Sequence, residues 1–435
     1  MCPSYIKKRF LLSLLVSVPL YSDILFYYNT AILPSILSYK KDMPLAIIRI
    51  EFNDYQFRDD ASAWHNKIFG TTEGDLNHYY NEISYGHFQF KEAIETDGTQ
   101  DGIITVHLNE DHPGNVNDFS DRIVSAAQLA DQYINYASYD KNKDGVISKD
   151  ELQLMFLVAG GESATGANPG IWAWNWCMYG GNSDAPTLDN VLIMDCAGGG
   201  NYSRFGEKHF DADTGENATI GIIAHELAHA VFSLPDLYDT DGSSEGIGYF
   251  GLMGGGSWGY QPGENPGATP VHMTGWSKVQ SHFITPVTIG TTQNLQLHAT
   301  SSGQYKLYKI PTPVENEYFL IENRAALGYD RGLYSINRGE GDFLGGVAIL
   351  HIDENQSDNN DEAHKLVDIE EANDPVLDDS TAKGDYQNLF YAGNQSDFDE
   401  NTAPNSNTYN GVQSGVSISN ISDRGDIMTL DITKN

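Results

Sequence analysis

The chain is poor in basic residues. It has 25 Lys and Arg against 60 Asp and Glu in 435 residues, which gives a formal net charge of −35. A surface of this sign repels nucleic acid and anionic membranes, so neither is expected as a partner. The charge suits calcium binding and a saline external medium, although solubility alone would also explain it.

Long apolar runs are absent except near the N-terminus. There, basic residues at positions 7–9 precede an apolar stretch over residues 10–21, which is the pattern of a secretory signal peptide. The stretch is too short to span a bilayer comfortably. We therefore predict a signal peptide over residues 1–22 and a secreted, extracellular mature chain. An uncleaved membrane anchor is the alternative.

Cysteine is also scarce, with three in the whole chain. Cys2 precedes the predicted signal, which leaves Cys177 and Cys196 in the mature protein. Two cysteines of an exported protein can form a disulfide. The sequence alone does not show whether the geometry allows these two to pair.

Hydrophobic residues make up 40% of the chain and aromatic residues 11%, which supports a packed core and excludes wholesale disorder. Apolar patterns predict buried strands at 45–51 and 152–159, and helices at 121–136 and 219–232. Beyond about residue 280, the pattern changes to short β-rich runs separated by turns. We predict an α+β fold with one domain over 44–283 and a β-rich C-terminal domain over 284–435.

The predicted helix 219–232 carries a possible metal site. His225 and His229 are four residues apart and so emerge from the same helical face, with Glu226 beside them. Zinc bound by two such histidines lowers the pKa of a water to about 7, and the glutamate can deprotonate that water. The five-residue motif alone also occurs on helices that bind no metal. Its flanks support the site, because Pro235 ends the helix and Met253 lies in a Gly-rich turn that could form a floor under the metal.

Several further motifs accompany this helix. Residues 225–258 contain His-Glu-Leu-Ala-His, Leu-Pro-Asp-Leu-Tyr-Asp-Thr-Asp, Ser-Ser-Glu-Gly and Leu-Met-Gly-Gly-Gly-Ser-Trp. Together they resemble the immune inhibitor A family of metallopeptidases, and the likeness continues at 77–87, 318–324, 350–354 and 364–371. The resemblance implies a zincin-type catalytic domain followed by β-rich structure, and secreted proteolysis of protein or peptide substrates. With the motif, it gives a zinc endopeptidase in which Glu226 is the general base.

Two carboxylates compete as the third zinc ligand. The metzincin pattern places this ligand six residues after the second His, where this chain has Pro235, and Asp236 is one step further. Phe232 occupies the position where family members usually have Gly, and a left-handed turn there would cost about 1–2 kcal/mol. Glu245 has no such conflict, and it precedes Met253 by a spacing that resembles the family pattern. We therefore favour Glu245, which would give a His₂Glu site, and keep Asp236 as the alternative.

A second metal site is predicted upstream. Residues 140–151 match the twelve-residue EF-hand loop, with Gly at its sixth position. Its ligands would be Asp140, Asn142, Asp144, the carbonyl of Val146, and Glu151 as a bidentate carboxylate. An apolar, strand-like run follows the loop, so we expect a structural calcium site rather than a paired sensor module.

Other functions remain open at this point. A calcium-dependent adhesin or carbohydrate-binding protein with a vestigial metal site is one alternative, which the intact pair of histidines and Glu226 disfavours. A zinc amidase acting on cell-wall peptides is another. Trp172, Trp174 and Trp176 alternate as in a strand, so we expect them in the core or in the wall of a cleft.

Overall fold

The computed structural model describes residues 41–435 except 117, 180–183, 338–342, 374 and 381. The predicted signal peptide, residues 1–22, lies outside this part of the chain. Among the described residues, no helix combines the length and the apolar character needed to cross a membrane.

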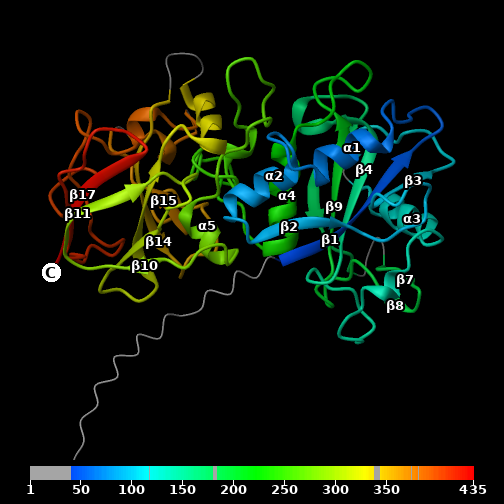
Figure 1. Cartoon of the computed structure of the whole chain (residues 1–435), viewed down its shortest axis with the longest axis horizontal. Coiled ribbons are helices and arrows are strands. Elements are labelled where there is room, and N and C mark those ends of the chain that lie inside the picture. The colour runs from blue at the N-terminus through cyan, green and yellow to red at the C-terminus, as the bar shows by residue number, and fades with distance from the viewer. Residues whose placement is uncertain (1–40, 117, 180–183, 338–342, 374, 381) are drawn as a thin grey trace, which may run out of the picture. The chain divides into compact units, whose positions relative to one another are not determined.

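A seven-stranded, mostly parallel sheet forms the N-terminal part of the fold (Figure 1). The strand order is β2-β1-β4-β9-β6, with β3 also paired to β1 and β5 to β4. Every pair is parallel except β6 with β9, so β6 is an antiparallel strand at one edge of the path. The strands are β1 (Lys41–Glu51), β2 (Phe88–Glu92), β3 (Ile103–His107), β4 (Gln153–Glu162), β5 (Gly170–Ile171), β6 (Trp174–Trp176) and β9 (Tyr202–Lys208).

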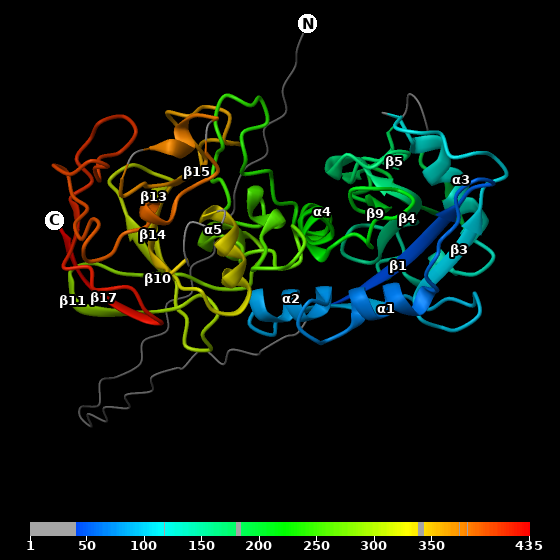
Figure 2. The same ribbon diagram turned by 90° about the horizontal axis from the view of Figure 1, so that it is seen from above.

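Helices cover both faces of this sheet (Figure 2). Leu45 and Ile47 of β1 pack into the core that contains α1 (Ala61–Phe69), α2 (Leu76–Ile83) and α4 (Ile220–Phe232). The alternate residues of β1, such as Ile48, pack on the other side with α3 (Ser120–Ala130). A strand buried on both faces is expected to be a continuous apolar run, and this explains the composition of residues 45–50.

Two further sheets follow in the chain. One has the order β10-β12-β13-β14-β15, and the other has the order β11-β17-β16. A short hairpin, β7 (Thr187–Leu188) and β8 (Val191–Leu192), lies upstream, and α5 (Gly275–Gln280) precedes the C-terminal sheets. The C-terminal strands are β10 (Val287–Thr288), β11 (Thr292–His298), β12 (Tyr308–Pro311), β13 (Glu317–Arg324), β14 (Gly346–Asp353), β15 (Val367–Ile369), β16 (Val416–Ser419) and β17 (Ile427–Lys434).

Strand β13 belongs to two cores. Phe319 and Ile321 pack with the three-stranded sheet, whereas Tyr318 and Leu320 join the same core as the catalytic-motif helix α4. The parts on either side of residue 283 therefore share apolar packing. The predicted domain limits, 44–283 and 284–435, stay predictions.

A buried histidine lies among carboxylates in the C-terminal sheets. The Nε2 atom of His351 in β14 lies 2.9 Å from Glu317 and its Nδ1 atom lies 3.0 Å from Glu370. Burial would lower the pKa of His351, but the hydrogen bonds and charges of both glutamates raise it to about 9. The imidazolium thus ties β13 and β14 to the segment after β15.

The fold follows most of the predicted elements and adds others. The predicted strands 45–51 and 152–159 correspond to β1 and β4, and the helix 219–232 corresponds to α4. The helix predicted over 121–136 ends at Ala130, because the chain turns there and the Tyr136 amide bonds to Asp189 instead. Strands β2, β3 and β9 were not predicted.

Candidate metal centre

Helix α4 is buried along almost its whole length, which explains why its sequence is apolar on every side. Gly221 of this helix packs against the backbone of Ser257. A Cβ atom at position 221 would lie 1.9 Å from the carbonyl oxygen of Ser257, so only glycine fits there. Phe232 ends the helix and packs on the rings of Phe88 and Phe283. The buried helix fixes the positions of both motif histidines.

The left-handed residue after α4 is Ser233, with φ of 55°, and its amide donates to the carbonyl of His229. The family pattern places this turn one residue earlier, at the position of Phe232. Because the turn comes at Ser233, Phe232 keeps its helical conformation and its place in the core. The chain then returns over the histidines, so that Asp236 reaches them although it lies one residue later than the metzincin pattern places the third ligand.

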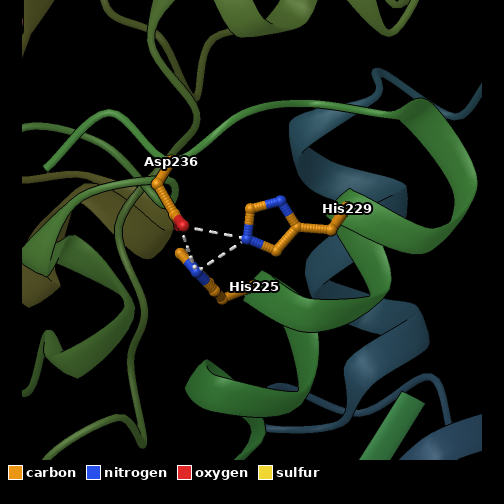
Figure 3. Close-up of side chains that lie close together, drawn as sticks. All are labelled: His225, His229 and Asp236. Atoms are coloured by element: carbon orange, nitrogen blue, oxygen red, sulfur yellow. Dashed lines mark hydrogen bonds and ion pairs between the residues drawn. The ribbon is translucent and has the colours of Figure 1, made fainter. Parts of the chain in front are cut away.

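Three side chains converge beside the helix (Figure 3). The Oδ1 atom of Asp236 lies 3.0 Å from Nε2 of His225 and 3.0 Å from Nε2 of His229. The two Nε2 atoms are 3.1 Å apart. Four-coordinate zinc with bonds of about 2.0–2.1 Å separates its ligand atoms by about 3.3–3.4 Å, so the three atoms are close to that spacing.

Backbone carbonyls set the tautomer of both rings. Nδ1 of His225 lies 2.9 Å from the carbonyl of Leu252, and Nδ1 of His229 lies 2.5 Å from the carbonyl of Leu234. Each Nδ1 therefore carries a proton, which leaves the lone pair of the neutral ring on Nε2, facing Asp236. Such partners orient the rings in the manner found for histidines that bind metals.

The converging atoms need a positive charge between them. Two Nε2 lone pairs and a carboxylate oxygen repel one another at these distances. A proton can supply the charge: burial alone would lower the pKa of His225, but Asp236 and Glu226 raise it to about 8. Burial would likewise raise the pKa of Asp236, whereas hydrogen bonds from the two histidines hold it far below its usual range. A divalent cation supplies more charge and suits this set of nitrogen and carboxylate ligands.

Within the described part of the chain, His225, His229 and Asp236 form a group of three whose ligand atoms lie within 4.8 Å of one another. Glu245, the third ligand favoured from the sequence, is not in this group. Its amide bonds instead to the carbonyl of Leu377, in a turn held by a later segment of the chain. The structure thus brings the alternative ligand, Asp236, to the histidines.

Glu226 lies next to this group and is buried. Its Oε2 atom accepts a hydrogen bond of 2.8 Å from the amide of Asn175 in β6. All four side chains line one cavity of about 770 Å³. Tyr238 lines it too, with its ring 6.2 Å from that of His225.

Tyr238 is a site residue that the sequence analysis missed. Burial and the nearby charges of Asp236 and Glu226 raise the pKa of its hydroxyl, which therefore remains a proton donor. Its position two residues after Asp236 was the only available signal. Tyr260 and His272, which follow the Met253 turn and could from the sequence also have stabilised the oxyanion, do not line this cavity. Tyr260 packs on Tyr334, and His272 is buried against Glu82.

The predicted calcium loop has several features of an EF-hand loop. Asp140 accepts from the amide of Gly145, and the carboxylate of Glu151 accepts from the amides at both ends of the loop. A parallel β-bridge joins Val146 of the loop to Leu192 of β8. The carboxylates of the loop accept hydrogen bonds from backbone amides of the same loop. Their oxygen atoms lie further from one another than the three ligand atoms of His225, His229 and Asp236.

A disulfide joins Cys177 to Cys196, with their Cα atoms 5.0 Å apart. It settles the pairing that the sequence left open. Both cysteines line the same cavity, and Cys177 directly follows β6. The bond therefore ties the end of this edge strand to the segment that follows β8.

A family model matches the part of the chain that contains these residues. Residues 124–282 match the family described as immune inhibitor A peptidase M6, catalytic domain, and this range contains α4, Asp236 and β6. No curated protein matches the chain.

Proposed function

Since the chain is a metalloendopeptidase of the immune inhibitor A (M6) family, with its catalytic domain matched over residues 124–282, we propose that it is a zinc-dependent enzyme exported from the cell. The convergence of His225, His229 and Asp236 within 4.8 Å carries this proposal. We also propose that this catalytic domain has a zincin-type fold. The basic and apolar pattern of residues 1–22 and the Cys177–Cys196 disulfide support export.

The zinc ligands in this proposal are His225, His229 and Asp236. We prefer Asp236 to Glu245 because its carboxylate oxygen lies 3.0 Å from both Nε2 atoms. The donor set of two neutral imidazoles and one carboxylate is an established one for catalytic zinc. When bound, zinc supplies a Lewis acid that polarises the scissile carbonyl and makes a nearby water more acidic.

Glu226 acts as the general base. It does not belong to the ligand group, but its carboxylate faces the same cavity. The hydrogen bond from the Asn175 amide holds Oε2 in place, so the carboxylate is fixed before substrate arrives. Glu226 takes a proton from the attacking water and passes it to the leaving nitrogen.

Tyr238 completes the site as a hydrogen-bond donor. Its hydroxyl keeps its proton at neutral pH, and it lines the same cavity as the three proposed zinc ligands. We assign it to the developing negative charge on the carbonyl oxygen of the substrate.

We also propose a structural calcium site in the loop 140–151. The complete EF-hand pattern, and the carboxylates of Asp140 and Glu151 that accept hydrogen bonds from amides within the loop, support it. Calcium there would stabilise the loop and, through β8, the segment that carries Cys196.

Glu226→Gln tests the proposed function. We expect the variant to bind zinc as the wild type does and to hydrolyse casein about 10²–10⁴ times more slowly, because only the proton acceptor is lost. A chelator such as 1,10-phenanthroline should inhibit the wild type, and added zinc should restore activity. Glu216→Gln, at an exposed glutamate just ahead of α4, is the matched control and should keep full activity. Normal turnover by Glu226→Gln would show that another group is the base.

A further inference from the structure

Strand β6 and the residues that flank it carry an unusual group of exposed aromatic side chains. Trp172, Trp174, Trp176 and Tyr179 are 57%, 44%, 43% and 63% exposed, although large apolar residues are usually buried. Trp172 and the two β6 tryptophans line the same cavity as the metal-binding group. Exposed apolar surface collected in this way marks a binding surface more often than chance.

The aromatic side chains around β6 are held in place by contacts with neighbouring residues. Trp174 and Trp176 are two residues apart in a strand, so both side chains are on one face, and their rings are 5.2 Å apart. The buried guanidinium of Arg204 lies 5.6 Å from the ring of Trp174 and donates to the carbonyl of Trp172. Asn175, between the tryptophans, donates its side-chain amide to β9. These contacts hold the strand and present the rings in a fixed arrangement.

The free edge of β6 faces the proposed base. In the described part of the chain, β6 pairs with β9 on one side only. The Asn175 amide faces away from β9, toward Glu226. An extended polypeptide that passes Glu226 along this edge would place every second side chain on one face, at intervals of about 6.6 Å. That spacing suits the two adjacent rings of β6.

We infer that Trp174 and Trp176 form a platform that selects substrates with aromatic or large aliphatic side chains at two alternate positions of an extended segment. This rests on the proposed peptidase function and names the substrate class for that site. A polypeptide is favoured over a glycan because the platform continues along a free strand edge into the cavity with Glu226. Tyr179, whose ring centroid lies 6.3 Å from that of Trp176, extends the platform at one end.

The experiment compares pairs of peptides that differ only in two alternate residues, either Phe or Ser. We expect the wild type to prefer the Phe peptide by about 10-fold or more in kcat/KM, since two aromatic contacts are gained in addition to the buried apolar area. Trp174→Ala and Trp176→Ala should reduce this preference at least threefold, mainly through KM. Phe210→Ala removes another exposed aromatic residue, 51% exposed and outside the cavity lining, and should leave the preference unchanged.

A binding measurement separates this inference from the proposed function. In Glu226→Gln, tryptophan fluorescence should report tighter binding of the Phe peptide than of the Ser peptide, and substitution of Trp174 should remove the difference. If this binding difference were observed but the wild type hydrolysed neither peptide, the peptidase assignment would be wrong and the inference about the platform would still hold. Equal binding of the two peptides, an unchanged preference in both tryptophan variants, or tighter binding of a soluble oligosaccharide would overturn the platform.

Discussion

Replacing Asp236 is the most direct test of the metal centre. Asp236→Ala removes the carboxylate oxygen that lies 3.0 Å from Nε2 of both histidines, and it removes the only negatively charged member of the group. Loss of groups that merely support metal ligands costs about 10–100-fold in affinity, so loss of a ligand should exceed that range. We expect the zinc dissociation constant to rise by at least about 100-fold, which corresponds to about 2.7 kcal/mol.

Competition with a chromophoric chelator measures this change on purified protein. Glu245→Ala is the matched variant, because Glu245 was the ligand favoured from the sequence and lies outside the group of three. We expect its zinc affinity to stay within about threefold of the wild type, on the scale of experimental error in such free energies. Asp236→Asn keeps the size of the side chain and one oxygen, so it should lose less affinity than Asp236→Ala.

Circular dichroism must show that all three variants are folded, because Asp236 lies in the turn that begins at Ser233. Zinc retained by Asp236→Ala and lost by Glu245→Ala would refute the assignment and restore the His₂Glu site. Zinc lost equally by both variants would also contradict it, since the structure gives Glu245 no part in the group.

The remaining predictions concern stability. Calcium should raise the melting temperature of the wild type, and the free energy of unfolding should rise by about 2.7 kcal/mol when calcium is at 100 times its dissociation constant. Glu151→Gln should lose most of this stabilisation. Asp150→Asn, which changes the exposed neighbouring acid, should keep it. Equal responses of wild type and Glu151→Gln would assign calcium to another place. The raised pKa of His351, about 9 against 6.5, predicts stability that is complete below about pH 6.5 and is lost as pH rises through 9, by about 3 kcal/mol in total. Urea unfolding of wild type and His351→Gln at pH 6 and pH 9.5 should show a smaller difference between the two proteins at the higher pH, and a difference independent of pH would contradict the role of the His351 imidazolium.

The sequence by itself determined the features that depend on local geometry. The helix of α4 and the common face of His225 and His229 follow from a spacing of four residues, which any α-helix converts into one face. The resemblance carried by the motifs of residues 225–258 pointed to the family that the comparison then matched. The strands β1 and β4 could be predicted because short, continuous apolar runs are typical of strands that are buried on both faces of a sheet.

Tertiary structure decided the features that depend on contacts between residues far apart in the sequence. The approach of Asp236 to the two histidines follows the left-handed turn at Ser233, whereas the family pattern places such a turn at the position of Phe232. Phe232 is held in the helix by its contacts with distant rings, and no local pattern contains that information. The same holds for the cysteine pair and for the exposure of Trp174 in β6, because the pairing of an edge strand with β9 is set by residues far away in the sequence.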